Sequence, residues 1–122
     1  MLTVMSGFPP GSVGIKATGE ITAADYEQVL VPAFESAREA VHGGKIRMLY
    51  LMGPEFTGYS AGAAWQDTKL GISHFRDWER VAVVSDIEWV RRLLHGFGWM
   101  IPAEVKLFAL AELDQARAWL TE

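Results

Sequence analysis

Two stretches of the chain are apolar at almost every position: residues 45–52 (KIRMLYLM) and residues 80–85 (RVAVVS). A strand with one face in water alternates apolar and polar residues, whereas a strand covered on both faces stays apolar throughout. Both stretches are therefore predicted to be strands of a parallel sheet with helices on its two faces. Residues 104–110 (EVKLFAL) are expected to form a further strand.

The N-terminal part of the chain has the pattern of a hairpin. Residues 1–6 (MLTVMS) and residues 13–19 (VGIKATG) are predicted to be strands, antiparallel to each other. Between them, GFPPG is typical of a turn. The chain is thus expected to contain about five strands, the first two forming the antiparallel part of the sheet.

Residues 21–44 have helical periodicity. Thr22 is a suitable N-cap with Asp25 three residues later, which is the spacing of a capping box. The paired glycines at residues 43–44 are expected to end this helix. Pro32 lies inside it, and because proline has no N–H it is expected to kink or locally break the helix.

Three more helices are predicted. One begins near Ser60, and one follows a capping-box pattern from Ser85 to Glu88. Behind that pattern runs an apolar stripe of Ile87, Val90, Leu94 and Phe97. The last covers residues 111–120; it is expected to pack through Leu113, Ala116 and Leu120, with Arg117 turned toward solvent. The resulting order, β-β-α-β-α-β-α-β-α, predicts a single α/β domain over residues 1–122, with a mixed, mostly parallel sheet covered by four helices.

Composition excludes several classes of function. The 122 residues contain no cysteine, which excludes disulfides, thiolate metal sites and a cysteine nucleophile. The net charge of −4, with both signs interspersed, disfavours nucleic-acid binding. No apolar run approaches the roughly 20 residues needed to span a bilayer, and the first residues lack the features of a signal peptide. We therefore expect a cytoplasmic protein.

The order of elements, with several local motifs, resembles the SpoIIAA-like family of the STAS-domain superfamily. The most specific stretches are WERVAVVSDIEW (residues 78–89) and LDQARAWL (residues 113–120). The resemblance implies the STAS fold and a binding or regulatory role rather than a reaction. In the related anti-sigma-factor antagonists, a serine at the start of the helix after the third strand is phosphorylated. The equivalent hydroxyls here are Thr57 and Ser60, although the chain reads EFTGYSAG where the antagonists carry an Asp-Ser pair.

The segment from Gly53 to Ser60 is predicted to be a turn at the carboxyl edge of the sheet, where open α/β sheets usually bind ligands. Its glycines would allow close approach, and its aromatic side chains would supply flat apolar contact. A purely structural interpretation is also open, in which Ser60 or Thr57 caps the next helix and Phe56 packs against its first turn.

Two functions follow as hypotheses. The first is a non-enzymatic module that binds an apolar or amphipathic small molecule, such as a lipid. Its pocket would lie under the helices that follow the third and fourth strands. This hypothesis also covers peripheral association with a membrane. The candidate ligand-binding residues are Phe56, Thr57, Tyr59, Ser60, Trp65 and Trp78. The alternative is a protein-interaction regulator that docks through the same turn, with Thr57 or Ser60 as phospho-acceptor. A homodimer is also expected, with no particular face assigned.

Other motifs leave this picture unchanged. Residues 95–102 (HGFGWMIP) are either an ordinary helix end or an exposed apolar lip that touches lipid, a ligand or a second subunit. The three histidines show no ligand spacing, and no G-x-S-x-G or phosphate-binding loop occurs. The sequence therefore predicts no catalytic residue, no metal site and no cofactor.

Overall fold

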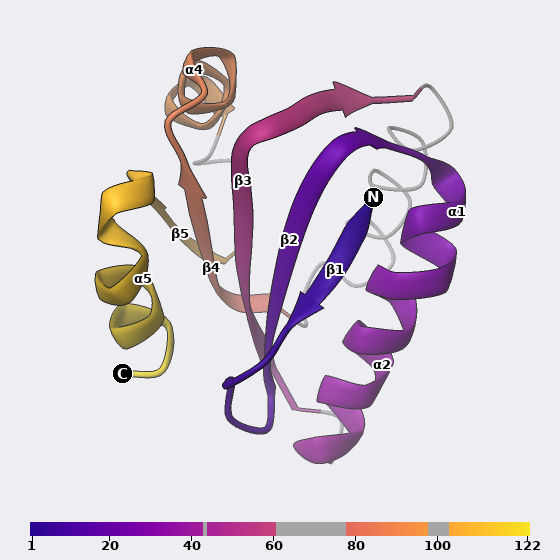
Figure 1. Ribbon diagram of the computed structural model, residues 1–122. Helices are drawn as coiled ribbons and strands as arrows, with labels where there is room; N and C mark the ends of the chain where they lie inside the picture. Colours follow the sequence, from indigo (N-terminus) through magenta and orange to yellow (C-terminus); the bar gives the residue numbers. More distant parts are fainter. Residues whose placement is uncertain (43, 61–77, 98–102) are drawn as a thin grey trace.

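The computed structural model describes residues 1–42, 44–60, 78–97 and 103–122. They contain one five-stranded sheet with the strand order β1-β2-β3-β4-β5 (Figure 1). β1 is antiparallel to β2, and every other neighbouring pair is parallel. The predicted mixed, mostly parallel sheet is thus confirmed. The strands are β1 (Leu2–Met5), β2 (Ser12–Ile21), β3 (Ile46–Tyr59), β4 (Trp78–Ser85) and β5 (Glu104–Phe108).

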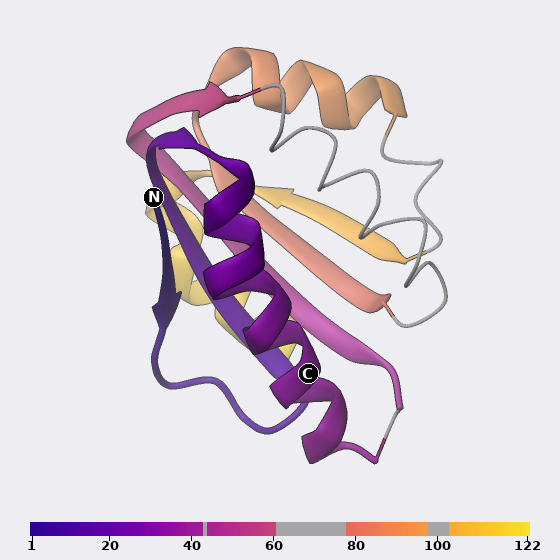
Figure 2. The same ribbon diagram turned by 90° about the vertical axis from the view of Figure 1, so that its right-hand side faces the viewer.

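Three helical regions lie in the described residues. The first is α1 (Ala23–Asp25), a π-helical turn (Tyr26–Leu30) and α2 (Val31–Ala40); the second is α4 (Glu88–Phe97); the third is a 3₁₀ turn (Leu110–Glu112) followed by α5 (Leu113–Leu120). Figure 2 shows α1 and α2 on one face of the sheet and α5 on the other, with α4 at one end. The fourth helix, expected to begin near Ser60, lies outside the described residues.

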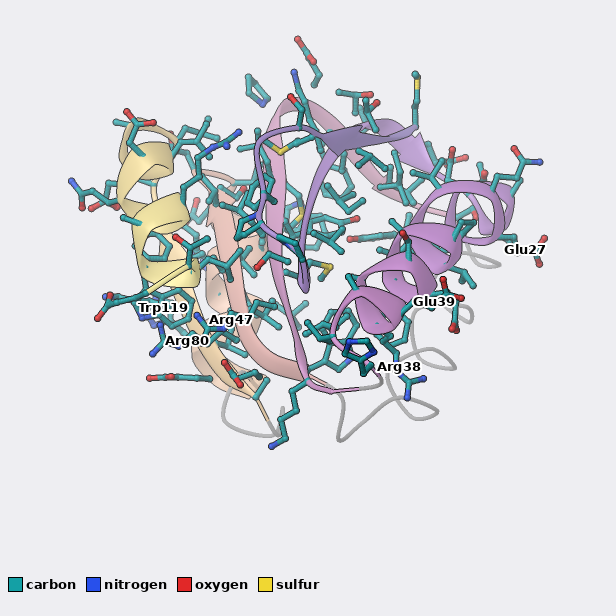
Figure 3. All side chains as sticks on the ribbon, turned by 90° about the horizontal axis from the view of Figure 1, so that it is seen from below. Glu27, Arg38, Glu39, Arg47, Arg80 and Trp119 are labelled. Carbon is teal, nitrogen blue, oxygen red and sulfur yellow. The ribbon has the colours of Figure 1, made fainter. Side chains whose placement is uncertain are left out.

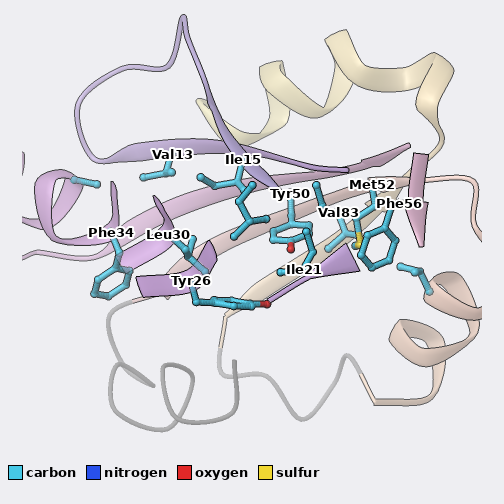
Figure 4. Packing of buried hydrophobic residues seen from close by; sticks show 14 of the residues in the cluster. Val13, Ile15, Ile21, Tyr26, Leu30, Phe34, Tyr50, Met52, Phe56 and Val83 are labelled. Carbon is cyan, nitrogen blue, oxygen red and sulfur yellow. The ribbon is translucent and has the colours of Figure 1, made fainter. Parts of the chain in front are cut away.

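Side chains of β3 are buried on both faces of the sheet, as its apolar run predicts. Leu49 packs with Ala116 and Leu120 of α5. The next residue, Tyr50, belongs to the larger core under α1 and α2, together with Tyr26 and Phe34 (Figure 4). Successive side chains of a strand point to opposite faces, so one continuous apolar stretch serves both cores.

The first helix accommodates Pro32 without breaking. Thr22 and Asp25 form the predicted capping box, in which the Thr22 N–H donates to the Asp25 carboxylate at 2.8 Å. Directly before α2, at Tyr26–Leu30, the helix widens into the π-helical turn, where the Val31 N–H donates to the Tyr26 carbonyl. Pro32 then falls in the first turn of α2, where a missing N–H costs little. The helix ends at Ala40, earlier than predicted, with His42 in the left-handed region (φ 54°).

Two arginines on neighbouring strands hold the carboxyl end of α5 (Figure 3). Arg47 Nη1 donates to the carbonyls of Leu120 and Glu122, at 2.7 and 2.8 Å. Arg80 Nη1 donates to the Trp119 carbonyl at 2.7 Å, and its guanidinium lies 5.1 Å from the centre of the Trp119 ring. Cations are favourable here because the last carbonyls of a helix are unpaired and carry partial negative charge.

The prediction for Arg117 was wrong. Its guanidinium lies over the Phe8 ring, 4.6 Å from the ring centre, rather than turning toward solvent. The ring of Phe8 is itself packed against Gly14 of β2. A planar cation stacks well on an aromatic face, and the loop between β1 and β2 brings Phe8 within its reach.

Candidate binding surface at the carboxyl edge of the sheet

The segment predicted to be a turn, Gly53 to Ser60, is instead the second half of β3. Up to Met52, β3 pairs with both β2 and β4, but β4 ends at Ser85, opposite Met52. Beyond that point, within the described residues, β3 pairs with β2 alone, and the Ser60 N–H donates to the Ile21 carbonyl at 2.8 Å. Figure 1 shows β3 bending where β4 stops.

Irregular pairing explains why glycine and proline occur inside this strand. Ala17 pairs with Met52, but the next paired residues are Gly19 and Phe56, so β3 contains extra residues at a bulge. Pro54 falls in that bulge, on a stretch with one strand neighbour, where its missing N–H breaks no ladder. Gly58 has φ 132°, a conformation that a side chain would strain.

An aromatic cluster covers this bulged end of the sheet. Phe56 is 6% exposed, and its ring centre lies 5.3 Å from that of Tyr59 and 5.8 Å from that of Trp89. Tyr59 stacks at 6.4 Å on Tyr26, and its hydroxyl bonds that of Tyr50 at 3.1 Å. These five residues, Tyr26, Tyr50, Phe56, Tyr59 and Trp89, are called the aromatic cluster below; Figure 4 shows its buried members Tyr26, Tyr50 and Phe56.

Sequence reasoning missed the most exposed part of this site. Trp89 and Leu93 lie one turn apart on α4 and are 48% and 51% exposed. Val90, on the side of α4 that faces the sheet, is only 4% exposed, and Leu94 also packs against the core. The exposed pair is called the α4 apolar face. The sequence feature that indicates this face is the run EWVRRLL, which has more apolar positions than one narrow helical stripe contains.

Besides Trp89 and Leu93, the exposed side chains described on α4 are polar. Arg92 forms an ion pair with Glu88 one turn earlier, and His95 is exposed. Arg91 Nη1 donates to the Ser85 carbonyl at 3.0 Å, which ties the helix to the end of β4. The helix begins at Glu88 rather than directly after Ser85, and the Ser85 hydroxyl accepts the Ile87 N–H at 3.1 Å.

Four of the six predicted site residues come together at this edge. Phe56 is buried, Thr57 is exposed, and Tyr59 and Ser60 are half-buried. Trp78 lies at the opposite, amino end of β4, where its ring centre is 5.0 Å from that of Phe34. Trp65 lies outside the described residues, as do residues 98–102 of the predicted apolar lip.

Two cavities among the described residues lie away from this edge. One of about 400 Å³ lies between α2 and the β1–β2 hairpin, and one of about 360 Å³ lies beside Arg117 and Phe8. Neither cavity is lined by a member of the aromatic cluster. The Phe56 side chain is buried. At the described part of the edge, Trp89 and Leu93 form an exposed apolar surface.

Two further kinds of feature bear on function, a metal site and a membrane-spanning helix. The described residues contain no group of three or more His, Asp or Glu side chains placed to hold a metal ion. Over the same residues, no helix is long and apolar enough to cross a membrane.

Comparison with known proteins supports the resemblance seen in the sequence. The SpoIIAA-like family model matches residues 12–121. The fold is similar, with a TM-score of 0.74 and 30% sequence identity, to the crystal structure of an uncharacterized DUF3478-family protein with a SpoIIAA-like fold from Shewanella loihica PV-4. That match covers 98% of this chain and 92% of the other. No curated protein matches. The chain therefore belongs to the SpoIIAA-like family of the STAS-domain superfamily.

Proposed function

We propose that the protein is a non-enzymatic binding module that holds the apolar part of a lipid against the α4 apolar face. Its family and fold support a binding or regulatory module, since STAS domains are generally non-enzymatic. One observation carries the lipid proposal: Trp89 and Leu93 are half exposed on one side of α4 while the Trp89 ring rests on buried Phe56. The buried Phe56 ring gives Trp89 a packed surface to rest on, while half of each side chain of the α4 apolar face remains accessible to a ligand.

The arrangement favours a lipid because α4 is amphipathic. Trp89 and Leu93 are exposed next to its sheet-facing side, and the exposed polar residues Arg92 and His95 continue round the helix away from the sheet. Tryptophan suits the boundary between acyl chains and headgroups, since its ring is apolar and its N–H is polar. Covering the exposed halves of both side chains removes on the order of 200 Å² of apolar surface from water, or about 5 kcal/mol before the cost of association. Binding through this face alone is thus expected to be weak and reversible.

Flotation with phosphatidylcholine vesicles, with and without phosphatidylglycerol, tests the proposal. Leu93→Ser should lower the fraction bound several-fold, because it removes half of the exposed apolar face. Val4→Ser is the matched control, since Val4 is 54% exposed but lies on β1. Its binding should equal that of the wild type. The proposal is wrong if the wild type binds neither kind of vesicle, or if both variants bind alike.

Regulation by phosphorylation is a second candidate, favoured by the exposure of Thr57. Thr57 is exposed on the bulged part of β3, whereas Ser60 is half-buried and its N–H is bonded to Ile21. A kinase would therefore reach Thr57 first. Incubation with cell lysate and ATP, followed by mass spectrometry, should find phosphate on Thr57 and lose it in Thr57→Val. If neither hydroxyl is phosphorylated and no protein is captured in a pull-down, this candidate fails.

A further inference from the structure

β1 forms one border of the sheet (Figure 2). Within the described residues it pairs with β2 alone. A border strand leaves every second residue with its N–H and carbonyl pointing away from the sheet, and such a row readily pairs with another strand.

The hydrogen bonds identify which groups of β1 point outward. The Met1 amino group donates to the Thr18 carbonyl, and the Thr18 N–H donates to the Met1 carbonyl. In an antiparallel ladder, bonded and non-bonded pairs alternate, so Thr3 and Met5 also bond β2, while Leu2 and Val4 direct their backbone groups outward. The Leu2 N–H bonds the Asp25 carboxylate. The Leu2 carbonyl and both backbone groups of Val4 therefore face the border.

This border lacks several of the features that usually prevent pairing between strands, although β1 is short. Proteins protect open borders with lysine, proline or a bulge, and β1 has none of these between Leu2 and Met5. No charged side chain occurs in residues 1–15, although 21% of the whole chain is charged. The Val4 side chain is 54% exposed. Strand pairing here would meet no charge repulsion and would cover an exposed apolar side chain.

The cavity next to the border has no charged lining residue. Val4 lines one side of this 400 Å³ cavity, and α2 lines the other with the small residues Ala33, Ser36, Ala37 and Ala40. Small side chains allow another backbone or helix to approach closely. β1 and this lining together form a strip without charged side chains, although the exposed Lys16 of β2 lies beside it, opposite Thr3.

We propose that β1 pairs with β1 of a second copy of the chain, antiparallel and centred on Val4. A two-fold axis at Val4 lets each copy donate its Val4 N–H to the Val4 carbonyl of the other. The same register sets Leu2 opposite Ser6, so that the outward Leu2 carbonyl accepts the Ser6 N–H. The two sheets then form one sheet of ten strands, and the α2 helices lie on the same face, beside each other across the axis.

A second copy fits this strip because a two-fold interface must be complementary to itself. Neutral, apolar surfaces satisfy that requirement, whereas a charged border would face the same charge on the other copy and be repelled by it. β1 has only four residues, so the interface is small and the dimer is expected to dissociate in the micromolar range. The assignment does not depend on lipid binding, since α4 lies at another end of the sheet.

Sedimentation velocity over a concentration series from about 1 to 300 μM, around the expected micromolar dissociation constant, tests the proposal. The wild-type mass should rise from 13.5 kDa toward twice that value. Val4→Pro removes the Val4 N–H, the central donor of the proposed interface, without removing a hydrogen bond to β2. Val4→Lys adds a positive charge at the two-fold axis. Each should weaken the dimer at least tenfold, with melting temperature as the check on folding.

Leu93→Lys is the matched control, because it puts the same charge on an equally exposed apolar residue of α4. It should dimerise like the wild type. A wild type that stays at 13.5 kDa throughout overturns the proposal, as does a Val4→Lys protein that folds and dimerises unchanged. If Val4→Pro fails to fold, Val4→Lys alone decides.

Discussion

The contact between Gly14 and Phe8 gives a sharp prediction about how the β1–β2 hairpin is held. A Cβ atom added at Gly14 would lie 2.1 Å from Cε2 of Phe8, and 2.6 and 2.7 Å from Cζ and Cδ2. Carbon atoms in contact are normally about 3.5 Å apart or more, so the ring would have to move by more than about 1 Å. Arg117 stacks on the ring, so moving the ring would also disturb that contact. Gly14→Ala should therefore cost about 1–3 kcal/mol, the usual cost of overpacking.

A double-mutant cycle separates this clash from other effects of replacing glycine. Urea denaturation would give the unfolding free energy of the wild type, Gly14→Ala, Phe8→Ala and the double variant. If the ring is the obstacle, Gly14→Ala should cost less than about 0.5 kcal/mol once Phe8 is alanine. Gly53→Ala is the control, because a Cβ there meets nothing within 4 Å. An equal cost of Gly14→Ala in both backgrounds would refute the reasoning.

Three more changes have definite expected outcomes. The Thr22 backbone N–H is the largest cause that lowers the pKa of the Asp25 carboxyl below its ordinary 3.8. Wild type should therefore exceed Asp25→Asn in melting temperature above pH 3.8, and this advantage should shrink as pH falls through the lower, folded-state pKa. Arg47→Met removes two bonds to the end of α5 and should cost about 2 kcal/mol in urea denaturation. Tyr59→Phe loses the bond to the Tyr50 hydroxyl and should cost about 1 kcal/mol, yet leave vesicle flotation unchanged because the ring remains.

Local patterns in the sequence predicted the framework of the fold. The apolar runs located β3 and β4, and the Thr22–Asp25 spacing located the start of the first helix. Such features are encoded by neighbouring residues, so they are readable without a structure. The antiparallel border strand also followed from its turn, GFPPG.

Errors arose where distant residues decide the outcome. Gly53, Pro54 and Gly58 are typical turn residues, but this stretch is a strand because β2 extends far enough to pair with it. Likewise, the apolar run of α4 does not reveal which half faces the sheet. Only the packed structure shows that Val90 is covered and that Trp89 and Leu93 are exposed. The proposed binding surface therefore includes Phe56 and Tyr59, which the sequence suggested, and Trp89 and Leu93, which it did not.

The early end of β4 has a consequence for how anything is held at this edge. Past Met52, β3 has a single strand beside it, and a strand with one neighbour opens to solvent more often than a strand with two. Phe56, the base under Trp89, lies on this less supported stretch. A ligand held at Trp89 as proposed would act on this stretch through the Phe56 ring, so we expect binding to be accompanied by tighter pairing of the stretch with β2. Slower amide exchange from Phe56 to Tyr59 would then report an occupied surface.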